Sequence, residues 1–454
     1  MDDKEFKDIL NKKYEELNID PNDKEYTRYL EEKLLKVLKY YNTHRDSKEM
    51  ILETIDKILP SFIQEYERMR TNINKISNSI ESNFGISINF ELIELFNIAN
   101  LCSNNDEFIK LRDEYFERIS SEPKFVGHDP IFAGLRELTY EDTLKIYNNV
   151  VNNVDCITPE FEGKMRFIID QDKPLFINGE VNKDAFDFKY LDKLADFARK
   201  NNMQMRMHNI IWHNDFLPCF NDLSNEDIYT FLDSYMNTIS ERYGDVIYSV
   251  DVLNEIASDE ENEVLRNSEW KNKLGDNYFI EVLKIAKKNF PDCELYYNDY
   301  GEQNENKRNN IMSVVNMIKR VEEEENISLL DGIGLQAHYS VNTSDNDIKD
   351  AYRDLTSLGK NIQVTELDVS YKEETNGFDY DANRVFRTVL DCASSYGIKL
   401  LNLWGVSSNI SWKSGKINNF LDENNEVSEY SEKMIDAYSR KKKLNKVNSI
   451  NQNL

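Results

Sequence analysis

The chain has 454 residues, a length that allows about two or three domains and a large hydrophobic core. Lysine and arginine number 56 against 83 aspartates and glutamates, and the net charge of −27 argues against a nucleic acid or a membrane surface as partner. Five scattered cysteines without a C-x-x-C pair predict free thiols in a reducing compartment, rather than a disulfide framework or a thiolate zinc site.

The start of the chain carries no targeting signal that we recognise. Residues 1–6 lack the basic start and apolar stretch of a signal peptide, and no run reaches the roughly 18 apolar residues of a membrane span. We therefore expect a cytoplasmic protein. Secretion by a route that needs no signal peptide is compatible with the same chemistry and stays open.

Residues 1–124 read as an all-α N-terminal domain. They contain one of the 15 glycines, Gly85, and none of the four tryptophans. Apolar residues recur at spacings of three and four, which predicts about five or six amphipathic helices. The simplest interpretation is a packed helical bundle that carries no catalytic or metal-binding site. Because amphipathic helices usually bury one face, we expect this extension to bind a protein partner or to self-associate.

From about Pro123 onward, β-rich runs alternate with amphipathic helical stretches, as in βα units around a parallel sheet. Eight strand candidates recur about every 38 residues, a spacing that fits a βα repeat. The sequence therefore predicts an α/β fold, a (β/α)8 TIM barrel over residues 125–442, followed by a polar tail over 443–454. The strand candidates begin near Ile131, Cys156, Gln204, Ile247, Cys293, Gly332, Asn361 and Lys399.

Two carboxylates, Glu255 and Glu366, close the otherwise apolar strands four and seven. In such barrels the functional groups lie at the carboxyl ends of the strands. Enzymes that cleave glycosidic bonds typically use a pair of carboxylates. One protonates the leaving oxygen, and the other attacks the sugar or stabilises its cationic form. Nearby aromatic rings would stack on sugar faces, while amides and imidazoles would hold hydroxyls.

Each of these residues also has a structural interpretation. A glutamate at a strand end is more often a helix cap or an ion-pair partner than a catalyst, and a histidine such as His213 is more often structural. A metal site is weakly indicated, because His208 and His213 lack an H-E-x-x-H motif or a carboxylate cluster. We expect neither a metal nor a cofactor.

The motifs at the strand ends, taken together, resemble the family 10 glycoside hydrolases, the endo-β-1,4-xylanases. The resemblance covers about Pro130 to Tyr438. The matching segments are Asp251-Val252-Leu253-Asn254-Glu255, Thr365-Glu366-Leu367-Asp368, His208-Asn209-Ile210-Ile211-Trp212-His213, Tyr297-Asn298-Asp299-Tyr300, Gly332-Ile333-Gly334-Leu335-Gln336-Ala337-His338, Trp404-Gly405-Val406 with Trp412, and Phe420-Leu421-Asp422-Glu423.

The resemblance implies a retaining mechanism on β-1,4-xylan or its oligomers, with Glu255 as acid/base and Glu366 as nucleophile. We also expect Asp368 to pair with His338 and keep Glu366 ionised. The substrate-binding residues that the resemblance implies are Glu160, Lys164, His208, Trp212, Asn254, Tyr300, Gln336, His338, Trp404 and Trp412.

Two positions depart from the family pattern. Phe161 replaces an asparagine, and Asp215 replaces a glutamine, both of which serve the sugar two units from the cut in the family. An aromatic ring at 161 would favour stacking on a differently placed or decorated sugar, and the Asp215 carboxylate could take two of its hydroxyls. A neighbouring side chain that restores the lost contacts is the alternative.

The sequence thus predicts a cytoplasmic retaining β-1,4-glycosidase that hydrolyses xylan or, inside a cell, xylo-oligosaccharides through a covalent glycosyl-enzyme. The alternative is a sugar-binding or sensory protein that has the same barrel but reduced catalytic activity. Its helical half would then transmit the signal or dock to another protein. Retention of both glutamates argues against that alternative.

Overall fold

The computed structural model describes residues 85–89, 93–120, 129–371, 378–398, 400–412 and 416–435. Before residue 85 it describes 3–17, 54–60 and the single positions 19, 27, 30, 34, 50, 52 and 63. The chain divides into two compact units, Met1–Asn83 and Phe84–Leu454, which are treated separately.

The first unit is helical at most of its described positions. Helix α1 (Asp3–Glu16) places Phe6, Leu10 and Tyr14 on one face, four residues apart, and all three are fully buried. They belong to a small core of their own, completed by Ile19, Leu30, Leu34, Ile55 and Leu59. The rest of the predicted all-α domain before residue 84 lies outside the described residues, as does the tail over 443–454.

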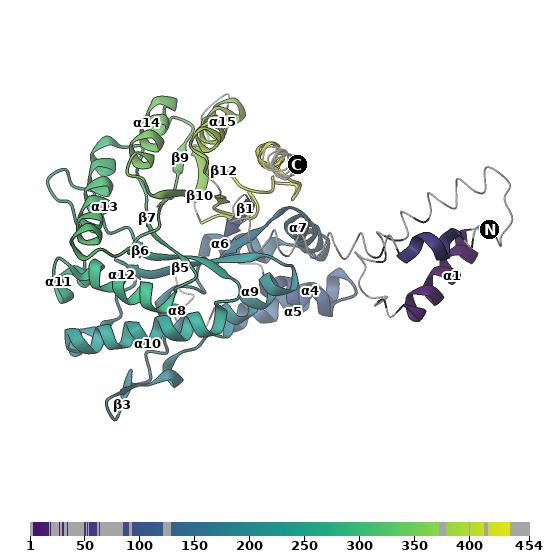
Figure 1. The fold of residues 1–454 in the computed structure, drawn as a ribbon, viewed down its shortest axis with the longest axis horizontal. Coiled ribbons are helices and arrows are strands. Elements are labelled where there is room, and N and C mark those ends of the chain that lie inside the picture. The colour runs from purple at the N-terminus through teal and green to yellow at the C-terminus, as the bar shows by residue number, and fades with distance from the viewer. Residues whose placement is uncertain are drawn as a thin grey trace. The chain divides into compact units, whose positions relative to one another are not determined.

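The second unit contains a closed barrel of eight parallel strands (Figure 1). Each strand pairs in parallel with the next, and the last strand, β11, pairs with both β10 and β1, so that the sheet has no free edge within the barrel. The barrel strands are β1 (Gly85–Asn89), β2 (Cys156–Thr158), β5 (Gln204–Trp212), β6 (Ile247–Asn254), β7 (Glu294–Asp299), β8 (Gly332–Leu335), β10 (Asn361–Tyr371) and β11 (Leu400–Leu403).

The first barrel strand is not where the sequence placed it. Ile131 lies in helix α6 (Asp129–Glu137), and the strand is β1, within the region assigned to the helical extension. Strand β1 alternates two isoleucines with two small polar residues, Ser87 and Asn89, which are buried as well. So short a strand with polar residues at alternate positions gives little apolar signal. The predicted domain boundary at 124 is therefore corrected to about residue 83.

Helices surround the barrel strands, as Figure 1 shows. Their apolar faces pack on the outside of the sheet; in α9, for example, Leu191, Leu194 and Ala198 are buried. Capping boxes fix the start of two of them: Thr139 with Asp142, and Ser224 with Asp227. The longer helices are α4 (Ile93–Leu101), α5 (Asn105–Ile119), α6, α7 (Tyr140–Asn153), α9 (Lys189–Lys200), α10 (Asn225–Tyr243), α12 (Tyr278–Asn289), α13 (Glu305–Glu325), α14 (Asp345–Thr356) and α15 (Phe378–Tyr396).

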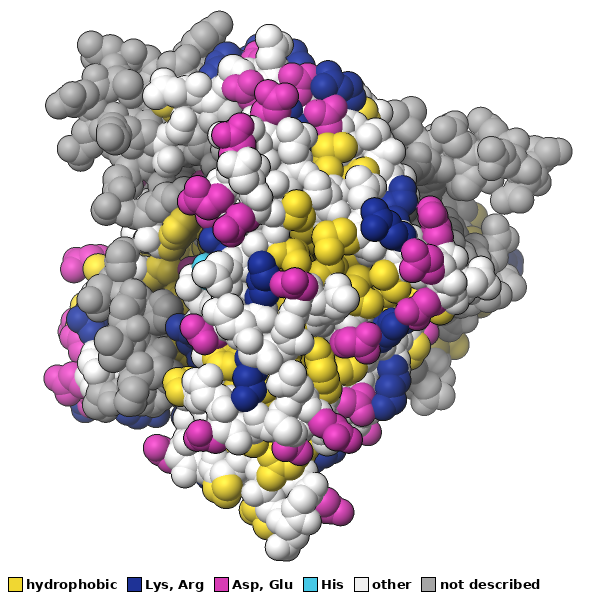
Figure 2. All heavy atoms as spheres, turned by 90° about the vertical axis from the view of Figure 1, so that its left-hand side faces the viewer, with side chains coloured by type: hydrophobic (Ala, Val, Ile, Leu, Met, Phe, Trp, Pro, Cys, Tyr) yellow, Lys and Arg dark blue, Asp and Glu magenta, His cyan; other side chains and the backbone are white. Residues whose placement is uncertain are grey.

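Shorter elements complete the connections between strands and helices. They are α8 (Met165–Ile168), α11 (Glu269–Leu274), the 3-10 turns Lys183–Ala185 and Pro218–Asp222, the hairpin β3 (Phe176–Ile177) with β4 (Glu180–Val181), β9 (His338–Ser340) and β12 (Lys416–Asn418). On the face that Figure 2 shows, hydrophobic side chains gather near the middle, and acidic and basic side chains surround them. Within the described residues, no helix is long and apolar enough to cross a membrane.

Candidate active site

Glu255 comes directly after β6, where the backbone turns sharply. Its φ of 57° lies in the left-handed region, which a residue other than glycine adopts only when its surroundings hold it there. Two hydrogen bonds to its backbone do so: the Glu255 N–H donates to the Asn298 carbonyl at 2.8 Å, and the Arg266 side chain donates from Nε to the Glu255 carbonyl at 2.9 Å. The strand end therefore fixes the direction of this carboxylate.

The side chain of Glu255 is held by two donors, one at the end of the neighbouring strand β5 and one directly after β8. Trp212 Nε1 donates to Oε2 at 2.8 Å, and Gln336 Nε2 donates to Oε1 at 3.0 Å. His213 Nδ1 lies 3.4 Å from Oε2. The carboxylate is 14% exposed, so a substrate can still reach it.

Glu366 is more deeply buried, in β10. Asn298 Nδ2 donates to its Oε1 at 2.8 Å, and His338 Nε2 lies 3.1 Å from its Oε2. Burial favours the neutral form, but the hydrogen bond from His338 and the charges of His208 and His338 outweigh it and lower the pKa of Glu366 to about 2. Glu366 is therefore a carboxylate at neutral pH, ready to act as a nucleophile.

His338 is itself held by a second carboxylate. Its Nδ1 lies 2.9 Å from Asp368 Oδ2, and Trp412 Nε1 donates to the same oxygen at 2.9 Å. Burial would lower the pKa of His338, but Asp368 and Glu366 raise it to about 10. The imidazole is thus protonated at neutral pH and donates to both carboxylates, so the pairing expected from the sequence is confirmed.

Amide side chains connect the two glutamates. Asn298 donates from Nδ2 to Asn254 Oδ1 at 2.8 Å as well as to Glu366, and its own oxygen accepts from Thr365 Oγ1 at 2.5 Å. Gln336 Nε2, which donates to Glu255, lies 3.5 Å from Asn254 Oδ1. The carboxylates of β6 and β10 are therefore fixed relative to each other by one continuous network.

A charged network inside the barrel supports His208. Arg206 Nη2 donates to Asp251 Oδ1 at 2.5 Å, and Asp251 Oδ2 lies 2.9 Å from His208 Nδ1. His208 Nε2 is 4.0 Å from Glu366 Oε1. Arg206 also donates to Gln363 at 3.0 Å, and all of these side chains are buried. Glu366 therefore faces an imidazole whose orientation is fixed by Asp251 and Arg206.

Aromatic rings lie beside these groups. Trp404 packs at 5.5 Å from the ring of His208, and Trp412 lies 5.0 Å from the ring of His338 and is 38% exposed. Lys164 Nζ lies 5.0 Å from the centre of the Trp212 ring. Flat apolar surfaces next to hydrogen-bonding groups are typical of sugar-binding clefts.

Most of the predicted site residues are linked by these contacts. Two are engaged differently. The Tyr300 hydroxyl donates to Asp259 at 2.7 Å and accepts from Arg266 at 2.9 Å, so it reaches the acid/base candidate only through Arg266. Glu160 accepts a hydrogen bond from Asn89. The residues brought together are Lys164, His208, Trp212, Asn254, Glu255, Gln336, His338, Glu366, Trp404 and Trp412.

Neither departure from the family pattern presents its side chain as expected. Phe161 is 3% exposed and packs in the core with Phe132 and Phe167, at ring distances of 6.2 and 5.6 Å. Asp215 is buried, and its Oδ1 accepts from Arg166 Nε at 2.6 Å. Stacking of a sugar on Phe161 and capture of two hydroxyls by Asp215 are therefore wrong expectations, since both side chains are engaged within the protein.

Sequence reasoning missed several contributors. Asn298 was quoted only within a motif, and His213 was assigned a structural role although its ring lies against Glu255. Asp251 stands within a matching segment but was given no role, although it holds His208. Arg266 contacts the Glu255 carbonyl, and no local pattern marks it. For His213, its place directly after Trp212 on a barrel strand end was the available signal.

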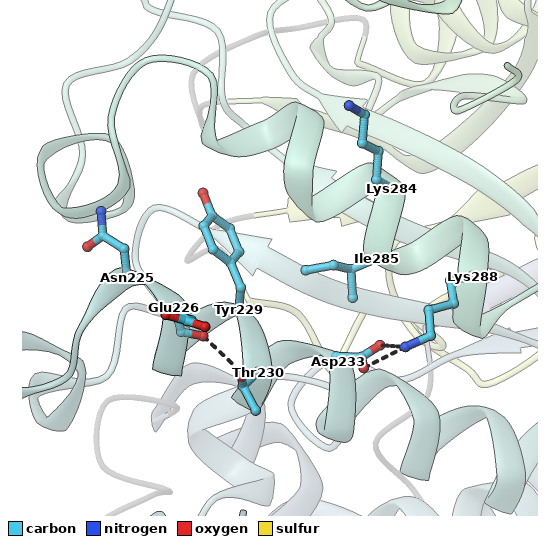
Figure 3. A pocket seen from close by; sticks show the side chains of 8 residues that line it. All are labelled: Asn225, Glu226, Tyr229, Thr230, Asp233, Lys284, Ile285 and Lys288. Atoms are coloured by element: carbon cyan, nitrogen blue, oxygen red, sulfur yellow. Dashed lines mark hydrogen bonds and ion pairs between the residues drawn. The ribbon is translucent and has the colours of Figure 1, made fainter. Parts of the chain in front are cut away.

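Among its described residues, the second unit offers no other cluster suited to catalysis or metal binding. In the described part of the chain, no three histidine, cysteine or acidic side chains gather to hold a metal ion. A groove of about 620 Å³ lies between α10 and α12 on the outer helical layer (Figure 3). An ion pair between Asp233 and Lys288, at 2.7 Å, crosses it. Its lining includes none of the strand-end residues, so we do not assign it to the site.

Comparisons with known proteins agree on one family. The family model described as Glycosyl hydrolase family 10 matches residues 132–439. An endo-1,4-beta-xylanase A of Caldicellulosiruptor saccharolyticus is 31% identical over 263 residues, which are 52% of this chain and 74% of that protein. An endo-1,4-beta-xylanase A of Thermotoga neapolitana is 30% identical over 259 residues, 53% of this chain but only 24% of that longer relative. A solved mutant structure in complex with xylotriose is 28% identical, with a TM-score of 0.56, and covers 64% of this chain and 92% of its own.

Proposed function

The chain belongs to glycosyl hydrolase family 10, and from this premise we propose that it hydrolyses β-1,4-xylan or xylo-oligosaccharides with retention of the anomeric configuration. One observation supports this most: Glu366 is kept ionised by His338, while Glu255 is held by neutral donors, Trp212 and Gln336, in the same network. An ionised nucleophile beside a carboxyl that can carry a proton is the arrangement that retaining hydrolysis needs.

In the first step, a Glu366 oxygen attacks the anomeric carbon, and the bond to the leaving oxygen breaks as Glu255 transfers its proton to that oxygen. The electron pair of the broken bond stays with the leaving sugar. The products are a shortened sugar chain and a glycosyl ester on Glu366. His338, protonated and held by Asp368, stabilises Glu366 as a carboxylate before attack and as the leaving group later.

In the second step, Glu255, now a carboxylate, removes a proton from water while the oxygen of that water attacks the anomeric carbon. The ester bond breaks, its electron pair returns to Glu366, and Glu255 carries the proton again. Two inversions give net retention. Trp212 and Gln336 hold Glu255 in one place for both of its roles.

The remaining side chains would form the subsites. We propose that Trp404 and Trp412 contact the sugar next to the cut and that Glu160 reaches toward the next sugar. Amide, imidazole and ammonium donors are suited to sugar hydroxyls. Those proposed to serve the sugars around the cleaved bond are Lys164, His208, Asn254, Gln336 and His338.

We propose that the first unit, residues 1–83, is an all-α domain, because the apolar face of α1 packs into a core within that unit. We propose further, from the amphipathic pattern of its sequence, that it binds a protein partner or a second copy. We also propose that the protein acts in the cytoplasm on oligosaccharides that have entered the cell. The five cysteines, all free, are suited to a reducing compartment.

Hydrolysis assays test the proposal. Aryl β-xylosides, aryl β-glucosides and linear xylo-oligomers are incubated with the protein and with the Glu366→Gln variant, and the products are identified. We expect cleavage of the xylose substrates by the native chain alone. No cleavage of any of them, or equal cleavage by the variant, would refute the proposed function.

A further inference from the structure

Arg166, on the short helix α8, lies beside the proposed acid/base and takes no part in the steps above. It follows Lys164 by two residues, just beyond the end of β2. The centre of its guanidinium lies 5.8 Å from the centre of the Trp212 ring, and Trp212 Nε1 donates to Glu255. One indole therefore separates Arg166 from the reacting groups.

Asp215 fixes the position of this arginine. Its Oδ1 accepts from Arg166 Nε at 2.6 Å and from the Arg166 backbone N–H at 3.2 Å. The Asp215 carboxylate is fully buried, and its own N–H donates to the Trp212 carbonyl at 2.9 Å. Because the buried carboxylate holds the guanidinium through Nε, the two terminal nitrogens of Arg166 keep a fixed direction. Little side-chain entropy is then lost when they bind a ligand.

The two terminal nitrogens of Arg166 are available. The Arg166 side chain is 40% exposed, and within the described residues neither Nη1 nor Nη2 donates a hydrogen bond. Lys164 Nζ lies over the same Trp212 ring, so two cations share one aromatic face. An arginine of this kind, anchored through Nε and open at its terminal nitrogens, is suited to bind a carboxylate.

The acidic side chains nearby compete little with a ligand for the terminal nitrogens of Arg166. The charge of Asp215 is already paired with Arg166. Glu160 accepts from Asn89 instead, and the carboxyl of Glu162 accepts from the backbone N–H of Phe161 at 3.2 Å. Burial raises the pKa of Glu162 to about 7, so part of it is uncharged at neutral pH. No acidic side chain among the described residues bonds the free nitrogens.

We infer that Arg166 forms a subsite for the carboxylate of a uronic acid carried as a side group on the xylose chain. The inference rests on the proposed function and narrows its substrate class to acidic, decorated oligosaccharides. It also gives Asp215 a role. The family resemblance led us to expect a sugar-binding residue at this position, but Asp215 instead orients Arg166, which binds the uronic acid.

The test compares xylotetraoses that carry one glucuronic acid on the first, second or third xylose with their methyl esters, which keep the shape but lose the charge. For one of the three positions, we expect kcat/KM of the native chain to be at least tenfold higher for the acid than for the ester. Arg166→Gln should bring this ratio close to one, and Arg166→Lys, which keeps the charge without the fork, should leave an intermediate ratio.

Arg353→Gln is the matched control, since it removes the same charge from an exposed side chain on α14. It should leave the ratio unchanged. Calorimetric binding of the same pairs to a Glu366→Gln background gives the ratio of Kd values without turnover. Absence of cleavage would therefore refute the proposed function alone. The inference would be overturned if acid and ester bound equally at all three positions, or if Arg166→Gln left the acid-to-ester ratio unchanged.

Discussion

Two N-terminal truncations separate the dispensable part of the chain from the barrel. One begins at Phe84, the boundary between the two compact units, and the other begins at Ser121, near the boundary that the sequence suggested. We expect the first protein to fold and hydrolyse aryl xylosides at close to the rate of the full chain. The second should not fold, because it lacks β1, and the sheet then opens between β2 and β11.

The size of the loss follows from burial. Between residues 84 and 120, nine large apolar side chains lie in the core of the second unit. Their removal uncovers apolar side chains on β2, β11, α7 and α9, the elements that β1 and α4 contact. At roughly 1.5–3 kcal/mol for each side chain uncovered, about five of them equal the total stability of about 5–15 kcal/mol of a typical protein. The nine are Ile86, Ile88, Ile93, Leu95, Phe96, Ile98, Phe108, Phe116 and Ile119.

Thermal unfolding followed by near-ultraviolet circular dichroism, together with kcat/KM on an aryl β-xyloside, distinguishes the two proteins. The truncation at Phe84 serves as the control for handling and expression. A cooperative transition and a kcat/KM within threefold of the full chain for the protein beginning at Ser121 would refute the reasoning. Loss of activity in a folded protein beginning at Phe84 would refute the division of the chain.

Four substitutions test the site, each with its own measurement. Glu366→Gln should reduce hydrolysis of every substrate to background in a product assay, and residual turnover above a few per cent would contradict its role. Glu255→Gln should slow substrates with poor leaving groups by about 10²–10⁴-fold but those with activated aryl groups far less, which a series of aryl xylosides measures. His338→Gln removes the cation that lowers the pKa of Glu366, so the acidic limb of the kcat/KM profile should move to higher pH; an unmoved limb would contradict this. Phe161→Asn should lower the free energy of unfolding by about 3–5 kcal/mol in urea rather than improve hydrolysis of linear xylotriose, because Phe161 is a core residue.

Seven of the eight strand positions could be predicted because each begins a buried β-rich run between helical stretches. The predicted starts at Cys293 and Lys399 are followed by β7 and β11 one residue later. The strand that was missed, β1, has Ser87 and Asn89 buried at alternate positions. Apolar patterning does not signal a strand whose buried residues include polar ones, and so the helices after it were assigned to a separate domain.

That the two glutamates come to one side of the barrel was also within reach of the sequence, because parallel barrel strands run in one direction. Glu255 follows β6 as expected, whereas Glu366 does not end its strand: β10 continues to Tyr371 and pairs there with β9 and β12.

Which way other side chains point was not within reach of the sequence. Asp215 occupies a position that suggested a sugar ligand, yet its partner is Arg166, 49 residues away in sequence. Tyr300 likewise has its hydroxyl engaged by Asp259 and Arg266. Pairings of this kind depend on loop paths, for which a single sequence carries no periodic signal.

The covalent intermediate is the central claim, and mass spectrometry of a trapped protein tests it most directly. A 2-deoxy-2-fluoro-β-xyloside with an activated leaving group should form the glycosyl-enzyme quickly, but hydrolysis of that intermediate should be slow. The fluorine destabilises the cationic transition state of both steps, whereas the activated leaving group accelerates only the first. The account predicts one added fluoroxylosyl group, located on the peptide that contains Glu366 and absent from Glu366→Gln. A label on another residue, or turnover without any covalent adduct, would contradict it.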